Sequence, residues 1–198
     1  MRGAAKLYYD RLKDLFGSIR VADGGGRVFE FHEGIERAAG LIISRGEAGR
    51  KLMFIGNGAS AAISSHMATD FWKTGGIRAV AFNDSSLLTC ISNDFGYEHV
   101  FEKPLEMFAD PGDLLVAISS SGRSPNVLGA VRAAREEQVG VITLSGFDHD
   151  NPLFSEGDLN FHVPHHGYGP VEVVHHSICH CLLDVIMDRR QGKMEEAG

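Results

Sequence analysis

The chain has 198 residues, 43% of them hydrophobic and 23% charged, which are ordinary values for one globular domain with a full hydrophobic core. Its net charge of -7 argues against nucleic acid and against an acidic membrane surface as partners, because both would repel it. The first residues lack the features of a signal peptide, and no apolar run approaches the roughly 20 residues that cross a bilayer. Three cysteines, an odd number, suit a reducing compartment, so we expect a cytoplasmic protein without a membrane partner.

The first 50 residues are predicted to form two amphipathic helices, separated by the glycines at 24–26. Apolar residues recur at helical spacing in the first helix, at Leu7, Leu12, Leu15 and Phe16. A second stripe follows at Val28, Phe31, Ile35, Ala39 and Ile42. These stripes must be buried, either on the sheet of the same chain or against another subunit, and the sequence leaves both alternatives open.

From residue 51 onward, short apolar runs alternate with helical segments. The runs are Leu52–Ile55, Ala79–Phe82, Leu114–Ile118, Val139–Leu144 and Leu159–Val163. The helices between and after them are predicted at about 60–74, 85–108, 125–138 and 170–190. Runs that are apolar throughout are typical of parallel strands covered on both faces, so the pattern predicts an α/β fold with a doubly wound, five-stranded parallel sheet flanked by helices. We expect one domain over residues 1–198, with a helical extension at 1–50, an α/β core at 51–190 and a loose tail at 191–198.

Two loops at predicted strand ends are suited to bind phosphate. Residues 56–60 (GNGAS) follow one strand and precede a helix, whose free amides and partial positive charge attract an anion. Residues 119–125 (SSSGRSP) place four hydroxyls ahead of the next helix, with Pro125 suited to its first turn. A serine before a helix is often only an N-cap, but two such loops at one sheet edge favour a monophosphate ligand. Neither GxGxxG nor GxxxxGK[ST] is present, so a dinucleotide or a nucleoside triphosphate is not favoured.

Histidines and carboxylates recur at a spacing of four in two predicted helices. His66 and Asp70 share a face of the helix after the first loop. In the last helix Glu172, His176 and His180 share a face, with His175 alongside. If the two helices meet, these groups form either a ligand set for a divalent metal such as zinc or an acid/base pair. The alternative is that they are ordinary surface or core residues.

The motifs together resemble the SIS (sugar isomerase) domain of the phosphoheptose isomerases. The resemblance covers about residues 51–189 and the layout of the two leading helices. It rests on GNGAS at 56–60 with His66 and Asp70, on NDFGY at 93–97, on SSSGRSPNV at 119–127 and on the helix from Val171 to Asp184. The chain departs from the family pattern in three places: Ala59 replaces a glycine, Asp70 a catalytic glutamate, and Pro170-Val171-Glu172 the family's Arg-Ile-Gln.

The resemblance implies an aldose–ketose isomerase that converts sedoheptulose 7-phosphate into D-glycero-D-manno-heptose 7-phosphate. It also implies a homotetramer with active sites at subunit interfaces and a divalent metal, zinc, in each site. The implied phosphate ligands are Ser60, Ser119, Ser121 and Ser124. The implied sugar contacts are Asn57, Gly58, Asp94 and Ser120. The implied metal ligands are His66, Asp70, Glu172 and His180.

The resemblance leads to an enediol mechanism. Asp70 or Glu172 removes the proton next to the carbonyl, and His180 transfers a proton on the oxygen side. A shorter carboxylate at position 70 shifts the reacting oxygen by more than about 1 Å, a displacement that can cost on the order of 10²-fold in rate. Two alternatives remain: a non-catalytic protein that binds a phosphosugar or a replication initiator, and an isomerase of a different sugar phosphate.

Overall fold

The computed structural model describes residues 3–190 and Gly192. Apart from Gly192, the tail predicted at 191–198 lies outside the described residues. The strands are β1 (Arg20–Asp23), β2 (Val28–Phe29), β3 (Leu52–Gly56), β4 (Ala79–Ala81), β5 (Leu114–Ser119), β6 (Gly140–Gly146) and β7 (Leu159–Val163). The α-helices are α1 (Ala4–Phe16), α2 (Phe31–Glu47), α3 (Ala59–Lys73), α4 (Ser85–Phe95), α5 (Glu102–Phe108), α6 (Pro125–Glu136) and α7 (Tyr168–Arg190), with 3₁₀ turns η1 (Tyr97–His99) and η2 (Pro152–Ser155).

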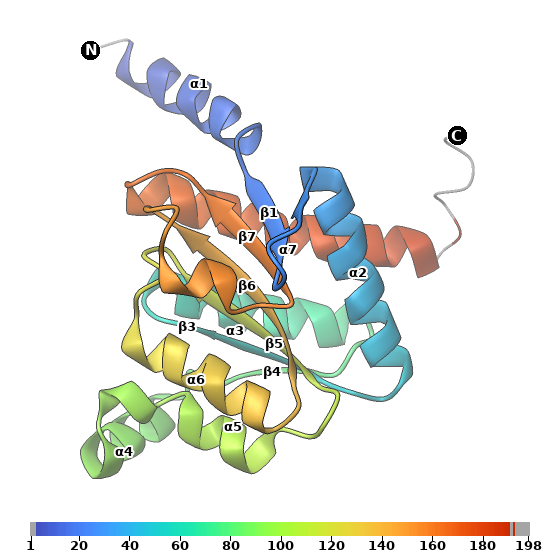
Figure 1. The fold of residues 1–198 in the computed structure, drawn as a ribbon, viewed down its shortest axis with the longest axis vertical. Helices are drawn as coiled ribbons and strands as arrows, with labels where there is room; N and C mark the ends of the chain where they lie inside the picture. The colour runs from blue at the N-terminus through green and yellow to red at the C-terminus, as the bar shows by residue number, and fades with distance from the viewer. Residues whose placement is uncertain (1–2, 191, 193–198) are drawn as a thin grey trace.

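The seven strands form one sheet in the order β2-β1-β7-β6-β5-β3-β4 (Figure 1). The five strands from β7 to β4 are parallel, which confirms the predicted five-stranded parallel sheet. The chain leaves β3 toward β4 on one side and returns to β5 on the other side of β3. The carboxyl ends of β3 and β5 therefore flank the topological switch point, where sheets of this kind bind ligands.

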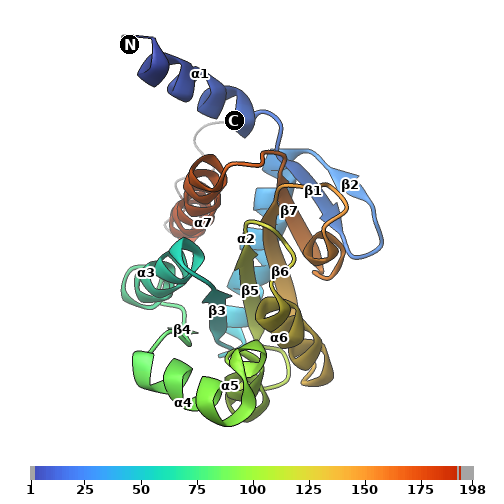
Figure 2. The ribbon, with the colours of Figure 1, turned by 90° about the vertical axis from the view of Figure 1, so that its left-hand side faces the viewer.

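Helices cover both faces of the sheet, as Figure 2 shows for α3 and α7 on one side and α6 on the other. Alternate residues of β3 and β5 enter two separate cores. Phe54 and Val116 pack with α2, α3 and α7, whereas Met53 and Leu115 pack with α5 and α6. This alternation requires apolar residues at every position of the strand, which explains the continuous apolar runs.

Two predictions about the helices were wrong. Residues 20–29 form an antiparallel hairpin that pairs through β1 with β7, so Val28 lies on a strand and is 74% exposed instead of leading the α2 stripe. The hairpin turn is held by Asp23, whose carboxylate accepts hydrogen bonds from the amides of Gly25 and Arg27. The single helix predicted at 85–108 is divided at Gly96, whose φ of +97° is outside the helical region.

The two leading helices differ in what covers them. The apolar stripe of α2 is buried, with Ile35, Ala38, Ala39 and Ile42 packed into the core shared with α7. Helix α1 instead projects away from the body (Figures 1 and 2), and Leu15 is its buried residue. None of the described helices combines the length and the apolar character that a bilayer-crossing helix needs.

Candidate active site

The first predicted phosphate loop joins β3 to α3 by a tight turn. Gly56 ends the strand, and a Cβ on it would lie 2.5 Å from the Cβ of Ser60, so only glycine fits there. Gly58 has a φ of +57° and is the N-cap of α3 without any side-chain cap. The amides of Ser60 and Ala61 donate to the backbone carbonyls of Asn57 and Gly58, so in the first turn of α3 the amide of Ala59 is the one without a partner among the described residues, as an anion site needs.

The second loop joins β5 to α6, and its hydroxyls face one another. The hydroxyl oxygens of Ser119 and Ser124 are 3.2 Å apart. Ser124 is the N-cap of α6, yet its side chain caps no helix amide. By contrast, Asp84 caps α4 by accepting hydrogen bonds from the amides of Ser86 and Leu87. The capping explanation for Ser124 is therefore excluded, and its hydroxyl, which hydrogen-bonds to that of Ser119, keeps further capacity to bind a ligand.

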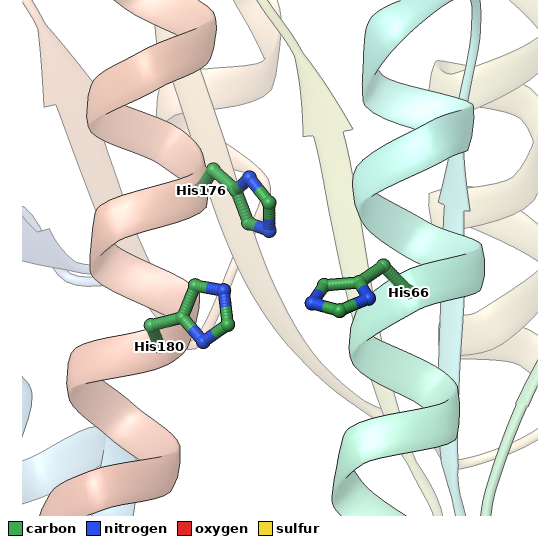
Figure 3. A group of neighbouring side chains, drawn as sticks. All are labelled: His66, His176 and His180. Atoms are coloured by element: carbon green, nitrogen blue, oxygen red, sulfur yellow. The ribbon is translucent and has the colours of Figure 1, made fainter.

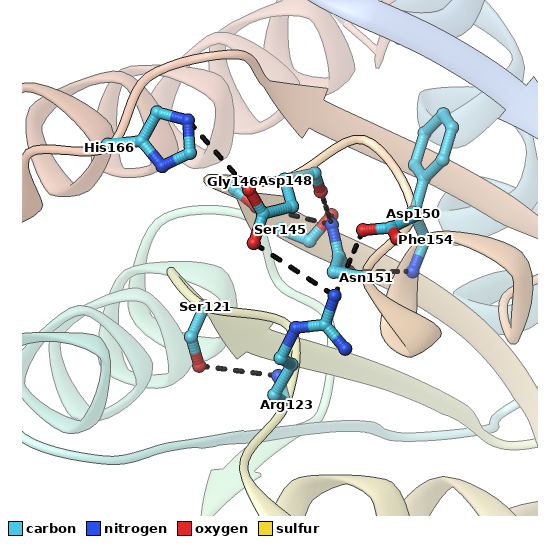
Figure 4. A network of polar contacts seen from close by, with 9 residues as sticks. All are labelled: Ser121, Arg123, Ser145, Gly146, Asp148, Asp150, Asn151, Phe154 and His166. Atoms are coloured by element: carbon cyan, nitrogen blue, oxygen red, sulfur yellow. Dashed lines mark hydrogen bonds and ion pairs between the residues drawn. The ribbon is translucent and has the colours of Figure 1, made fainter.

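A polar network behind the second loop holds it in place (Figure 4). Gly122 has a φ of +62°, and a Cβ there would lie 1.9 Å from the amide oxygen of Asn151. Asn151 is buried and donates through its side-chain amide to the carbonyls of residues 146 and 148. The guanidinium of Arg123 pairs with Asp150 at 2.9 Å and lies 3.9 Å from Asp148. These acidic residues engage Arg123, so the hydroxyls and amides of the loop are the groups left to bind an anion.

Both loops line one cavity of about 250 Å³. Its lining residues are Asn57, Gly58, Ala59, Ser60, Ile118, Ser119, Ser120, Ser121, Ser124, Tyr168 and Glu172. The pairing of Gly56 with Ile118 across β3 and β5 brings the two loops together. Every predicted phosphate residue, the sugar-contact candidates Asn57, Gly58 and Ser120, and the carboxylate of Glu172 therefore share this cavity.

A pair of asparagines ties the two loops to each other. The side-chain amides of Asn57 and Asn126 exchange two hydrogen bonds, each 2.9 Å long. The hydroxyl of Tyr97 donates a third, of 2.8 Å, to the side-chain oxygen of Asn57. Asn126 is 2% exposed, so this pairing also satisfies a buried amide. Asn126 was not among the predicted site residues, although its place directly after Pro125 put it at the helix start.

A second cluster lies where α3 faces α7. Figure 3 shows His66 of α3 pointing toward His176 and His180 of α7. One ring nitrogen from each histidine lies within 4.8 Å of the others. Asp70 adds a carboxylate oxygen 3.2 Å from Nε2 of His66. The predicted meeting of the two helices therefore occurs, with His176 as a member that the predicted metal set left out.

The two neighbouring histidines of α7 have different environments. Burial lowers the pKa of His176, the charges of His180 and His66 lower it further, and Asp70 opposes these effects. Burial also lowers the pKa of His175, to about 4, so His175 is neutral and Nε2 lies 2.9 Å from the carbonyl oxygen of Ser145. A neutral imidazole is the form that binds metal, and His176 is held in that form.

The remaining predicted residue, Asp94, does not line the cavity. It is exposed on α4, where its carboxylate accepts a hydrogen bond of 2.9 Å from Asn93. Conversely, Tyr168 lines the cavity without having been predicted. It stands one helical turn before Glu172, so the stripe that singled out Glu172 extends to it.

Comparisons with known proteins agree with this geometry. The family model for the SIS domain matches residues 27–146. The phosphoheptose isomerase of Proteus mirabilis is 38% identical over 162 residues, which cover 78% of this chain and 83% of that protein. The phosphoheptose isomerase of Enterobacter sp. is 39% identical over 160 residues, covering 77% and 82%. The structure of phosphoheptose isomerase GmhA from Neisseria gonorrhoeae has a TM-score of 0.73 and 37% identity, covering 78% of this chain and 86% of that one.

Proposed function

Because the chain belongs to the SIS domain family and, within it, to the phosphoheptose isomerases, we propose that it converts sedoheptulose 7-phosphate into D-glycero-D-manno-heptose 7-phosphate. The observation that carries this proposal is that one cavity brings together two helix starts without side-chain caps, five serines and Glu172. A phosphate group on the hydroxyls leaves the sugar chain to extend toward the helix that bears Glu172.

The phosphate is anchored by Ser60 at the start of α3 and by three serines of the second loop, Ser119, Ser121 and Ser124. Helix-start amides and hydroxyls bind phosphate without a positively charged side chain, which fits a protein with a net charge of -7. Asn57, Gly58 and Ser120 contact the sugar from the same cavity. Asp94 is the remaining proposed sugar contact; it lies three residues before Tyr97, which hydrogen-bonds to Asn57.

The reaction moves two protons within the substrate. A carboxylate removes a proton from C1 of the open-chain ketose, giving an enediol, and returns it to C2, while the proton of the C1 hydroxyl passes to the C2 oxygen. Glu172 is the better placed base because it lines the cavity, whereas Asp70 contacts His66. His180 carries the proton between the two oxygens, as an imidazole can do near pH 7.

A divalent metal, zinc, fits the cluster on α3 and α7. The residues offer imidazole nitrogens and a carboxylate, which are the donors that zinc prefers. The resemblance to the family assigns the metal to His66, Asp70, Glu172 and His180, and of these we propose His66, Asp70 and His180 as ligands. When bound, such a metal supplies Lewis-acid polarisation of the carbonyl.

Four further proposals complete the description. Residues 1–198 act as one SIS domain, and the protein is a homotetramer with active sites near subunit contacts. Exposed apolar side chains support an oligomer, among them Leu7 and Tyr9 on α1 and Trp72 on α3. The tetramer binds the sugar phosphate but neither nucleic acid nor membrane. A cytoplasmic location is supported by three free cysteines.

Incubation of the purified protein with sedoheptulose 7-phosphate, followed by detection of the aldose, tests the function. Glu172→Ala and His180→Ala should each lower kcat by about 10²-fold or more while the substrate still binds. Asp184→Asn, an exposed change on the same helix, should leave kcat unchanged. Sugar-phosphate binding without turnover in the wild type would instead indicate the non-catalytic branch of the family, and turnover of another sugar phosphate alone would reassign the substrate.

A further inference from the structure

We propose that His176 is a metal ligand together with His66, His180 and Asp70, and that Glu172 stays outside the coordination shell. The proposal rests on the metal cofactor proposed above, and it changes the ligand set. The resemblance to the family assigns the metal to positions 66, 70, 172 and 180. The structure instead gathers a third imidazole, that of His176, with those of His66 and His180.

The three imidazoles converge from two helices (Figure 3). The ring centroid of His66 is 5.3 Å from that of His176 and 5.4 Å from that of His180, and the two rings of α7 are 4.6 Å apart. Their candidate donor atoms all lie within 4.8 Å of one another. Ligand atoms of a tetrahedral zinc site, with bonds of about 2.0–2.1 Å, stand roughly 3.3 Å apart. Small side-chain rotations therefore bring the three nitrogens to one ion.

His176 also has an unsatisfied buried atom. Its Nε2 is inaccessible to solvent and has no hydrogen-bond partner among the described residues. A buried polar atom without a partner costs about 1–3 kcal/mol, so native proteins rarely leave one. Both ring nitrogens of His162 and Nδ1 of His175 are also buried without a partner, but of these three histidines only His176 belongs to the gathered imidazole group, where a shared metal would satisfy its nitrogen.

Asp70 completes the set with a negative charge. Its carboxylate oxygen is 3.2 Å from Nε2 of His66, which is close to the separation of two atoms bound to one zinc ion. Asp70 is one methylene shorter than the glutamate of the family pattern. A third histidine next to it supplies an additional donor at the place where the carboxylate reaches less far.

Glu172 belongs to a different neighbourhood, although it shares the helix stripe. It lines the cavity with the serines proposed to bind phosphate. Neither Glu172 nor Asp70 is among the three gathered donors, but the carboxylate of Asp70 contacts the ring of His66, whereas no hydrogen bond or ion pair joins Glu172 to a histidine among the described residues. The stripe of α7 is therefore divided into a carboxylate for the sugar at position 172 and imidazoles for the metal at positions 176 and 180.

Zinc affinity, measured by competition with a chromophoric chelator, tests this division without any turnover. His176→Ala should bind zinc on the order of 100-fold more weakly. Loss of a group that only hydrogen-bonds to a metal ligand already lowers metal affinity by about 10- to 100-fold, and loss of a ligand itself should cost at least as much. Glu172→Gln should bind zinc within about threefold of the wild type. His166→Ala, a change at a histidine that is 75% exposed, is the matched control and should have no effect. X-ray absorption of the zinc-loaded proteins should count three imidazoles in the wild type and two in His176→Ala.

Two results would overturn the proposal: wild-type affinity in His176→Ala, or loss of zinc in Glu172→Gln but not in His176→Ala. Thermal melting of the metal-free proteins checks that they fold, and His176→Gln replaces the alanine variant if that one does not. The readout also separates this inference from the proposed function. Zinc bound through three imidazoles without isomerisation refutes the isomerase and keeps the ligand set, whereas an isomerase that binds no zinc refutes the ligand set and keeps the enzyme.

Discussion

Replacing Gly56 by alanine should displace the phosphate anchor without touching any charged group. The new Cβ would lie 2.5 Å from the Cβ of Ser60 and 2.9 Å from its backbone carbon and oxygen. Ordinary contacts begin near 3.4 Å, so the start of α3 must move by about 0.9 Å. The clash involves backbone atoms, which a side-chain rotation cannot relieve.

A displacement of about 1 Å at a binding group can lower catalytic efficiency on the order of 10²-fold. That factor corresponds to about 2.7 kcal/mol of lost transition-state stabilisation. Because Ser60 is proposed to hold the non-reacting phosphate, we expect most of the loss as a higher KM for sedoheptulose 7-phosphate. The inhibition constant of inorganic phosphate, tested as a competitive inhibitor, should rise by a similar factor.

Gly40→Ala provides the matched control for this change. Gly40 lies inside α2, and the nearest atom to an added Cβ is Nη1 of Arg189, at 3.7 Å, an ordinary van der Waals distance. This variant should gain about 0.5–1 kcal/mol of stability, because glycine is unfavourable in a helix, and should keep full activity. A folded Gly56→Ala protein with wild-type KM and wild-type phosphate inhibition would refute the assignment of the loop.

Three further predictions concern the support of the site and the metal. Lys51→Met leaves the buried carboxylate of Asp113 without its cation and should lower the free energy of unfolding by about 3–5 kcal/mol, measured by urea denaturation. Burial alone would lower the pKa of Lys51, but the hydrogen bonds to Asp110 and Asp113 outweigh burial and raise that pKa above 10.5. The stabilisation by charged Lys51 should therefore be complete below pH 10.5 and be lost only as the pH rises past the raised pKa. If Lys51→Met had no effect on stability near neutral pH, this reasoning would be contradicted. Asn126→Ala removes both side-chain hydrogen bonds to Asn57 and should reduce kcat/KM about 10-fold at unchanged zinc content. An unchanged kcat/KM would show that the Asn57–Asn126 pair does not support the active site. Dialysis against a chelator should abolish isomerisation and added zinc should restore it, whereas full activity in a metal-free sample would remove the metal from the mechanism.

The parallel core was predictable because each of its strands can be recognised from its own residues. The apolar runs around Phe54 and Val116 are buried on both faces, so each reads as a strand without knowledge of its neighbours. The hairpin at 20–29 has no such run, and its strands form because β1 pairs with β7, nearly 140 residues away along the chain. The break at Gly96 was missed because the apolar pattern continues on both sides of it.

The candidate site shows the same division between local and distant information. Gly56, Ser60 and Ser124 were found because turn and helix-start chemistry is local, and parallel strand ends necessarily meet at one edge of the sheet. Spacing alone also placed Glu172, His176 and His180 on one stripe of the last helix. The sequence by itself therefore determined the sheet, the two serine-bearing loops and the chemical types available to act there.

Which of these groups lie close to one another depends on the tertiary structure. His66 of α3 lies opposite positions 176 and 180 of α7, while position 172, one turn earlier, opens into the serine-lined cavity. Which residues of α7 face His66 depends on where α3 packs along α7. This packing is set by the burial of apolar residues in the core between the two helices and the sheet. A periodicity of four residues records the face of one helix, but it carries no information about the height at which another helix crosses it.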